Sequence, residues 1–330
     1  MSARPDEGRV EPRVEPLVDV TQRRVAIVMS NAIGDTLVLM VIVRNLLRNG
    51  VDVTVFGRPA YALRRWFPDV TIHPMPEQLF DRAWLAPFDV VLQMHVEQPV
   101  PMLRTLHHRV FDMDSVIFGD RAGCMAERFA DFCRQELALA NVGMETGMTP
   151  PPLLRHRRHG MRVAIHPEAS TEDKRWLPRR FVTLAQRLQR RGYDVHFVIA
   201  PHERERWKEL EHWGIPAPVF ADPHELACWL YESGWFIGND SGVGHLASCL
   251  GVPTLSLFRR RRVSERWRPG WGAGAVVLPW QWVPGASFKE KFWRQTLTCA
   301  RVESAFHRLV REQQSATGQA AHLAGVTQSS

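Results

Sequence analysis

The chain has 330 residues, of which 45% are hydrophobic and 23% are charged, and its formal net charge is +7. This length suits two domains of roughly 100–150 residues, and the composition excludes a protein that is disordered over most of its length. The basic charge favours acidic partners, such as phosphorylated small molecules, anionic lipid or nucleic acid, although solubility alone explains it equally well.

Five cysteines are scattered along the sequence, and no two of them have C-x-x-C spacing. Their number and spacing argue against a zinc site and a disulfide framework, and they favour a reduced, cytoplasmic compartment. The N-terminus lacks the apolar segment of a signal peptide, and no run of about 18 apolar residues predicts a transmembrane helix. We therefore expect a cytoplasmic protein that meets a membrane only at its surface.

The first half of the sequence alternates between strands and helices. Residues 1–22 are polar, contain three prolines and predict a flexible arm. The elements predicted next are a buried strand at 24–29, an apolar helix at 36–49 that ends before Gly50, and strands at 51–56 and 88–94. This order predicts a parallel α/β sheet, and we expect the first domain over residues 23–150.

A change of composition between residues 141 and 160, with three consecutive prolines, predicts a linker. The second domain is expected over residues 160–290. Its predicted elements are strands at 162–166, 194–200, 235–237 and 253–258, and helices at 178–191 and 244–250. An amphipathic helix over 291–312 and a flexible polar tail over 313–330 complete the prediction. Two such domains in tandem place a ligand cleft between them, beyond the carboxyl ends of the strands.

Three polar loops follow predicted strands, where ligands bind in such sheets. In the loop at residues 31–37, Gly34 permits a tight turn and Asp35 lies at the start of a helix, where the helix dipole favours a carboxylate. Asp35 could also be a helix cap without chemistry. The loop is not a dinucleotide-binding turn, because it has no G-x-G-x-x-G sequence.

The other two loops contain groups that suit an anion. The loop at residues 166–176 offers hydroxyls and Lys174 to a phosphate, although a solvated polar loop would look the same. The loop at residues 237–247 is glycine-rich and starts a helix, which is typical of an anion site. Asp240 would repel a phosphate and suits a ribose hydroxyl or a backbone cap. His245 could donate to a phosphate or be an ordinary helix histidine.

Together, these loops resemble the bacterial ADP-heptose:lipopolysaccharide heptosyltransferases, which form glycosyltransferase family 9. Residues 239–254, N-D-S-G-V-G-H-L-A-S-C-L-G-V-P-T, are similar to that family's signature. Residues 33–37, I-G-D-T-L, resemble its N-terminal loop, and residues 173–178, D-K-R-W-L-P, resemble its middle loop. The resemblance spans about residues 24–260. It implies the GT-B fold, with two facing Rossmann-like domains, parallel sheets and an interdomain cleft, and a final helix that crosses back to the first domain.

The resemblance also implies an activity. This is an inverting, metal-independent transfer of a sugar, heptose from the co-substrate ADP-heptose, to an acceptor in lipopolysaccharide biosynthesis or to a related surface glycan. Asp35 would be the general base, and Lys174 would hold the donor diphosphate. No cofactor is expected, and no cluster with metal-ligand spacing occurs in the sequence. The donor-binding residues would be Ser170, Glu203, Asp240, Ser241, Gly242, Val243, Gly244 and His245.

The acceptor site is predicted from charge alone. Arg58 and Arg64 in the first domain, with Arg259 and Arg260 in a four-arginine run that departs from the family pattern, could bind a phosphorylated or acidic glycolipid or the anionic inner-membrane surface. A solvated basic loop and surface are the alternative. The Trp- and Pro-rich segment 270–289 matches nothing in the family. Further candidates by charge are Arg65, Arg104, His107, His108 and Arg109.

Two other interpretations remain open from the sequence. The same fold and mechanism could use another nucleotide sugar and a different glycan or protein acceptor. A non-catalytic nucleotide-sugar-binding protein is the second alternative. No nucleic-acid-binding module is recognisable, because the arginines are spread and not interleaved with aromatics. We expect a monomeric enzyme that binds no nucleic acid and works in the cytoplasm, at the inner face of the inner membrane.

Overall fold

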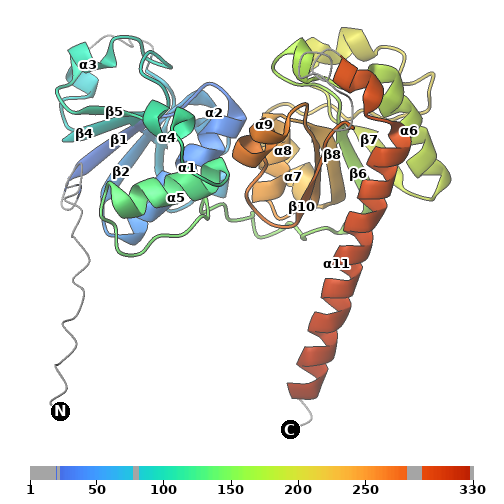
Figure 1. Cartoon of the computed structure of the whole chain (residues 1–330). Helices are drawn as coiled ribbons and strands as arrows, with labels where there is room; N and C mark the ends of the chain where they lie inside the picture. Colours follow the sequence, from blue (N-terminus) through green and yellow to red (C-terminus); the bar gives the residue numbers. More distant parts are fainter. Residues whose placement is uncertain (1–19, 21–22, 77–81, 281–291, 328–330) are drawn as a thin grey trace, which may run out of the picture.

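Figure 1 shows the computed structural model, in which two α/β domains lie side by side and a long C-terminal helix extends from the second. The structure describes residue 20 and residues 23–76, 82–280 and 292–327, with the backbone alone described for 317–327. The expected N-terminal arm lies outside the described residues except for Val20, which is buried in the core of the first domain.

The first domain contains a five-stranded parallel sheet in the order β3-β2-β1-β4-β5. The strands are β1 (Arg24–Val28), β2 (Asp52–Phe56), β3 (Thr71–His73), β4 (Val90–Gln93) and β5 (Val110–Asp112). The central β1 is buried at all but its first residue, as its apolar run predicts for a strand covered on both faces. Val28 pairs with both Phe56 and Gln93, so the carboxyl ends of three strands meet at one edge.

Helix α1 (Ile33–Arg48) begins within the first of the three polar loops, at residues 31–37. Eleven of its sixteen residues are buried, because it packs against β2, α5 and α8 of the other domain at once. It begins three residues before the predicted start, which puts Asp35 in its first turn. The other helices of this domain are α2 (Arg58–Ala62), α3 (Leu103–Leu106), α4 (Asp114–Phe118) and α5 (Met125–Gln135), with 3₁₀ turns η1 (Arg64–Trp66) and η2 (Arg82–Trp84).

The second domain repeats this plan with the strand order β10-β9-β8-β6-β7. The strands are β6 (His159–His166), β7 (Asp194–Phe197), β8 (Ser233–Asn239), β9 (Thr254–Leu257) and β10 (Gly274–Val277). All seven residues of the central β8 are buried. The helices are α6 (Pro178–Arg190), α7 (Pro223–Tyr231), α8 (Gly242–Cys249) and α9 (Arg261–Trp267), with 3₁₀ segments η3 (Glu172–Lys174) and η4 (Pro201–Trp207).

The end of the chain differs from the prediction. Residues 292–296 are helical, the helix breaks at Leu297 and Thr298, and α11 (Cys299–Thr327) then continues through the segment expected to be a tail. The expected crossing to the first domain is wrong. Helix α11 packs on α6, β9 and β10, because its Phe306 is buried in the second core and its Glu303 pairs with basic residues of α6 and the turn that follows it.

Two sequence features near the C-terminus, the arginine run and the Trp- and Pro-rich segment, contain regular secondary structure. The arginine run is not a loop throughout, because α9 begins at Arg261. The Trp- and Pro-rich segment contains β10, which completes the second sheet, while its residues 281–289 lie outside the described part of the chain. Among the helices that the structure describes, none is sufficiently long and apolar to cross a bilayer.

Candidate functional site

A cavity of about 1110 Å³ lies between the two domains. The first domain lines it with residues 31–35, and the second lines it with the segments that follow β6, β7 and β8. Parallel strands end and helices begin at this edge of each sheet, so unpaired backbone N–H groups face the cavity. The cavity is at the upper end of the size range of small-molecule sites, and therefore has room for a large, extended ligand.

Asp35 lies on the first-domain wall. It is in the first turn of α1, whose N-cap, Ala32, has no side chain to cap the helix. The Asp35 carboxylate instead accepts a hydrogen bond of 3.0 Å from the Ser30 hydroxyl, which itself accepts one of 3.1 Å from the Ala32 N–H. The helix dipole favours the ionised carboxylate at this place, and Ser30 fixes its orientation.

The start of α8 lines the cavity from the second domain. Its N-cap, Ser241, makes no capping hydrogen bond, although serine usually does so there. The Ser241 hydroxyl and the Nδ1 atom of His245 are both buried and have no hydrogen-bond partner within the described part of the chain. Because a buried unpaired polar atom costs about 1–3 kcal/mol, the two atoms fit a site completed by a polar ligand. Gly242 and Val243 also line the cavity, whereas Gly244 packs toward Phe236.

Burial lowers the pKa of His245, and the nearby carboxylates of Asp240 and Asp35 oppose this shift. The imidazole is therefore neutral near pH 7. A neutral ring carries one proton on either nitrogen, so Nδ1 can donate to a ligand in one tautomer and accept in the other.

Lys174 and Asp240 meet in an ion pair, with 2.9 Å between Nζ and Oδ2, and both line the cavity. The Lys174 side chain is 38% exposed and that of Asp240 is 11% exposed. The amine is thus accessible to a ligand, and it is also paired with a carboxylate.

Lys174 lies in the segment 172–176, and each residue of this segment makes an ion pair or a hydrogen bond with another part of the domain. Trp176 donates its backbone N–H to the Asn239 amide oxygen (3.1 Å), and Asn239 donates to the Pro167 carbonyl (2.6 Å). Hydrogen bonds from the Thr171 hydroxyl, and then the Arg259 guanidinium, lower the pKa of Asp173. The ion pairs of the segment are Glu172–Arg294, Asp173–Arg259, Lys174–Asp240 and Arg175–Glu168.

Two other predicted donor residues also line the cavity. Ser170 is exposed in the loop after β6. Glu203 is on η4, where its carboxylate caps the 3₁₀ segment by accepting a hydrogen bond of 2.9 Å from the Ala200 N–H. The structure thus brings Asp35, Lys174 and every predicted donor residue except Gly244 to one cavity.

The predicted acceptor arginines lie elsewhere, and none of the four lines the cavity. Arg58 is exposed at the start of α2, and the Arg64 guanidinium lies 4.1 Å from the centre of the Tyr61 ring. Arg259 pairs with Asp173 of the lysine segment, and Arg260 is the N-cap of α9. Their role in acceptor binding stays a prediction. His107 is a poor surface candidate, because it is buried and its Nε2 atom bonds to the Phe88 carbonyl.

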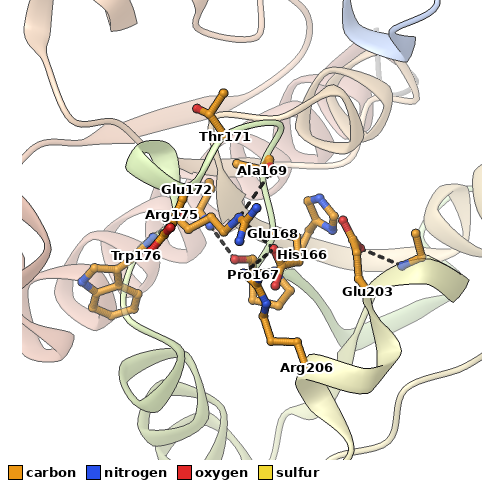
Figure 2. Close-up of polar contacts among 12 residues, drawn as sticks. His166, Pro167, Glu168, Ala169, Thr171, Glu172, Arg175, Trp176, Glu203 and Arg206 are labelled. Atoms are coloured by element: carbon orange, nitrogen blue, oxygen red, sulfur yellow. Dashed lines mark hydrogen bonds and ion pairs between the residues drawn. The ribbon is translucent and has the colours of Figure 1, made fainter.

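Several cavity residues were not predicted as site residues. His166 is buried and its Nδ1 atom donates to the Val198 carbonyl at 2.8 Å, while burial lowers its pKa. Glu168, Arg175 and Arg206 form a charged cluster beside it (Figure 2). An acidic residue two positions after a buried strand was the available sequence signal for Glu168. The apolar part of the wall comprises Val198, Ile199, Phe220, Pro223 and Leu226.

The two domains touch at paired glycines beside the cavity. A Cβ atom on Gly242 would lie 2.9 Å from the Gly34 backbone nitrogen, and one on Gly34 would lie 3.3 Å from the Gly242 Cα. The first turns of α1 and α8 are therefore in backbone contact. On other parts of the interface, Trp66 Nε1 donates to His224 Nδ1 (3.1 Å) and Trp271 Nε1 donates to the Met144 carbonyl (2.7 Å).

No cluster of three or more His, Cys, Asp or Glu side chains within the described ranges could hold a metal ion. Lys174, Arg175 and Arg206 bring positive charge to the cavity, and the N-terminus of α8 adds a partial positive charge.

The second domain matches a known family. Residues 151–291 match the profile of glycosyltransferase family 9 (heptosyltransferase). No curated protein sequence matches the chain.

Solved structures share the fold over most of the chain. ADP-heptose lipopolysaccharide heptosyltransferase II of E. coli is 16% identical, with a TM-score of 0.64 over 88% of this chain and 99% of its own. A glycosyltransferase family 9 protein of Veillonella parvula is 15% identical, with a TM-score of 0.66 over 89% and 98%. E. coli heptosyltransferase WaaC, solved with ADP, is 15% identical, with a TM-score of 0.60 over 87% and 99%.

These matches agree with the architecture of two domains that each contain a five-stranded parallel sheet. Residues 151–291 thus resemble glycosyltransferase family 9 (heptosyltransferase), and the chain as a whole shares the fold of solved heptosyltransferases.

Proposed function

We propose that this enzyme transfers a sugar, with inversion and without a metal ion, from a nucleotide sugar to a hydroxyl group of a lipopolysaccharide core or related surface glycan. The donor we propose is ADP-heptose, because WaaC has been solved with ADP and with ADP-2-deoxy-2-fluoro heptose. The observation that carries the proposal is one cavity that is lined by Asp35 from the first domain and by Lys174 and the start of α8 from the second.

The proposed chemistry needs a base and an anion site on opposite sides of the sugar. The acceptor oxygen attacks the anomeric carbon and forms the new glycosidic bond, while Asp35 takes the hydroxyl proton. The bond from that carbon to the diphosphate breaks on the far side, and its electron pair leaves with the nucleoside diphosphate. Lys174, the Ser241 hydroxyl and the N–H groups of α8 would stabilise the negative charge that grows there.

Lys174→Ala is expected to weaken ADP binding by about 10-fold or more, because a charge-assisted contact contributes roughly 1.5–3 kcal/mol. The variant also leaves Asp240 without its partner at 2.9 Å, so its carboxylate would repel a phosphate. Isothermal calorimetry with ADP measures the effect. Lys208→Ala is the matched control, since Lys208 lies outside the cavity and pairs with Glu205. Equal affinities in the two variants would remove Lys174 from the diphosphate site.

Activity is expected to persist in excess EDTA. Lys174, the arginines and the α8 N-terminus provide positive charge at the place where the leaving group develops its negative charge. The measurement is the rate of nucleoside diphosphate release with chelator, compared with the rate after Mg²⁺ or Mn²⁺ is added back. Complete loss of activity in chelator, restored by a divalent ion, would show that the reaction is metal-dependent.

A donor screen tests the sugar and the base. Purified enzyme is incubated with ADP-heptose and with ADP-, GDP- and UDP-hexoses, and nucleotide release is measured with delipidated core oligosaccharide as acceptor. We expect ADP-heptose to be the preferred donor. A different preferred nucleotide sugar would retain the mechanism and change the donor, whereas release from none of them would contradict a transferase.

The acceptor and the location of the enzyme are part of the same proposal. The net charge of +7 and the exposed arginines Arg58 and Arg64 suit a phosphorylated glycolipid on the cytoplasmic face of the inner membrane. Mass spectrometry of lipopolysaccharide from a deletion strain is the decisive observation. We expect one core sugar and everything attached beyond it to be missing.

A further inference from the structure

Glu168 is a buried carboxylate in a cavity that suits an anion. It is the second residue after β6, lines the cavity and is only 2% exposed. A buried negative charge is costly unless it is paired, and near a nucleoside diphosphate it would also repel the ligand. Its presence on this wall therefore requires a reason that outweighs both effects.

The contacts of Glu168 supply that reason (Figure 2). Its Oε1 atom accepts a hydrogen bond of 2.8 Å from Trp207 Nε1. Its Oε2 atom lies 3.0 Å from Arg175 Nε and 3.7 Å from an Arg206 terminal nitrogen. One carboxylate thus holds three donors from two separate segments of the chain.

Each of the two segments carries a proposed donor-binding residue. Arg175 directly follows Lys174, and the segment that ends in Arg206 and Trp207 is η4, which also carries Glu203. Lys174, Glu203 and both arginines line the same cavity. The distance between the lysine and the Glu203 carboxylate is therefore set partly through Glu168.

Arg206 is the more exposed and more distant of the two arginines that pair with Glu168. Its side chain is 51% exposed, compared with 21% for Arg175. At 3.7 Å it is ion-paired with Glu168 without the short contact that Arg175 makes. A planar guanidinium held at the cavity wall by one carboxylate still has donors free for an incoming phosphate.

We propose that Glu168 is a positioning residue for the donor: it joins the Lys174 segment to η4 and aims Arg175 and Arg206 at the anionic part of the nucleotide sugar. This inference rests on the proposed function, because it takes a nucleoside diphosphate as the ligand. It predicts that the negative charge of Glu168 increases the affinity for an anion.

The direction in which ADP affinity changes when the charge of Glu168 is removed tests the proposal. Glu168→Gln keeps the shape and the acceptor for Trp207 but removes the charge that holds the arginines. Glu205→Gln is the matched control, because Glu205 lines the same cavity, is 84% exposed and pairs only with Lys208 among the ion pairs observed. Both variants make the cavity more positive by one charge. Direct electrostatics alone would strengthen ADP binding in both.

We expect Glu168→Gln to weaken ADP binding at least 10-fold in calorimetry and Glu205→Gln to leave it unchanged or slightly tighter. The donor KM should rise with little change in kcat. Partial unfolding would instead lower kcat and the binding stoichiometry, because it reduces the number of intact sites. Binding by Glu168→Gln that is as tight as wild type, or tighter, would overturn the inference.

A second variant keeps the test valid if Glu168→Gln is unstable. Arg206→Gln removes a half-exposed partner, and it should weaken ADP binding in the wild-type background. If Glu168 aims Arg206, this loss should largely disappear in the Glu168→Gln background, whereas independent contacts would give additive losses. No effect of Arg206→Gln in a stable wild-type background, or additivity in the double variant, contradicts the inference while leaving the proposed function intact. Failure of wild-type enzyme to bind ADP would overturn both.

Discussion

Asp35→Asn is expected to lower turnover roughly 10²–10⁴-fold, the usual contribution of a positioned general base. The amide keeps the size of the carboxylate and can still accept a hydrogen bond from Ser30, but it cannot take a proton from the acceptor. Asp35 belongs to the first domain, whereas the proposed diphosphate site belongs to the second, so affinity for ADP should change little. Single-turnover rates and calorimetry on the same preparation separate the two effects.

Ser30→Ala is the graded control for this substitution. It keeps the Asp35 charge and removes the 3.0 Å hydrogen bond that orients it, so a smaller fall in turnover is expected. Wild-type turnover in Asp35→Asn would exclude Asp35 as the base. A loss of ADP affinity as large as the loss of turnover would instead assign Asp35 to donor binding.

Gly242→Ala is expected to lower turnover by about 100-fold, because misplacement of catalytic groups by about 1 Å has effects of this size. The added methyl group would lie 2.9 Å from the backbone nitrogen of Gly34, where neither backbone can move aside locally. The domains must separate at this point, and Asp35, one residue after Gly34, moves away from the α8 wall.

Gly244→Ala provides a matched control on the same helix. Its added methyl group would have ordinary contacts, with the nearest atom of the Phe236 ring at 3.4 Å. Alanine is favoured over glycine inside a helix by roughly 0.5–1 kcal/mol, so both variants should fold. Thermal unfolding and turnover are measured for the pair. Equal turnover in Gly242→Ala and Gly244→Ala would mean that the glycine contact does not set the active geometry.

The central strands and first helices of both domains could be predicted because each is a long, strongly patterned segment. Strand β1 and helix α1 are continuous apolar runs, and α6 has a clear apolar face that ends near Gly192. The edge strands β3 and β5 contain only three residues each and have no period that can be detected. Neighbouring strands in the sheet, and not their own sequence, determine their conformation.

Some of the cavity residues could likewise be predicted from local sequence patterns, and others could not. Asp35, Lys174 and Ser241 follow strands within recognisable loops, so their positions at the carboxyl edge could be predicted. Glu168 was in one of these loops, but its importance depends on Arg206 and Trp207, which come from another segment. Pairings between distant segments leave no local pattern.

The course of the last helix could not be predicted for a related reason. An amphipathic pattern shows that α11 has an apolar face, but it does not identify the surface that covers it. The answer lies in α6 and the residue after it, whose Arg187 and Arg191 pair with Glu303. The resemblance implied that this helix would pack on the first domain, and the structure differs from that expectation.

The glycine contact also brings two like charges together. The N-termini of α1 and α8 each carry roughly half a positive charge, and because their first turns are in backbone contact, their repulsion is on the order of 1 kcal/mol for an effective dielectric constant near 20. This repulsion opposes the contact between the two domains. A diphosphate at the start of α8, where the proposed donor would bind, would cancel it, and an energy of this size shifts a two-state equilibrium about fivefold. Under the proposed function, we therefore expect the nucleotide sugar to bind before the acceptor and to strengthen the contact between the domains.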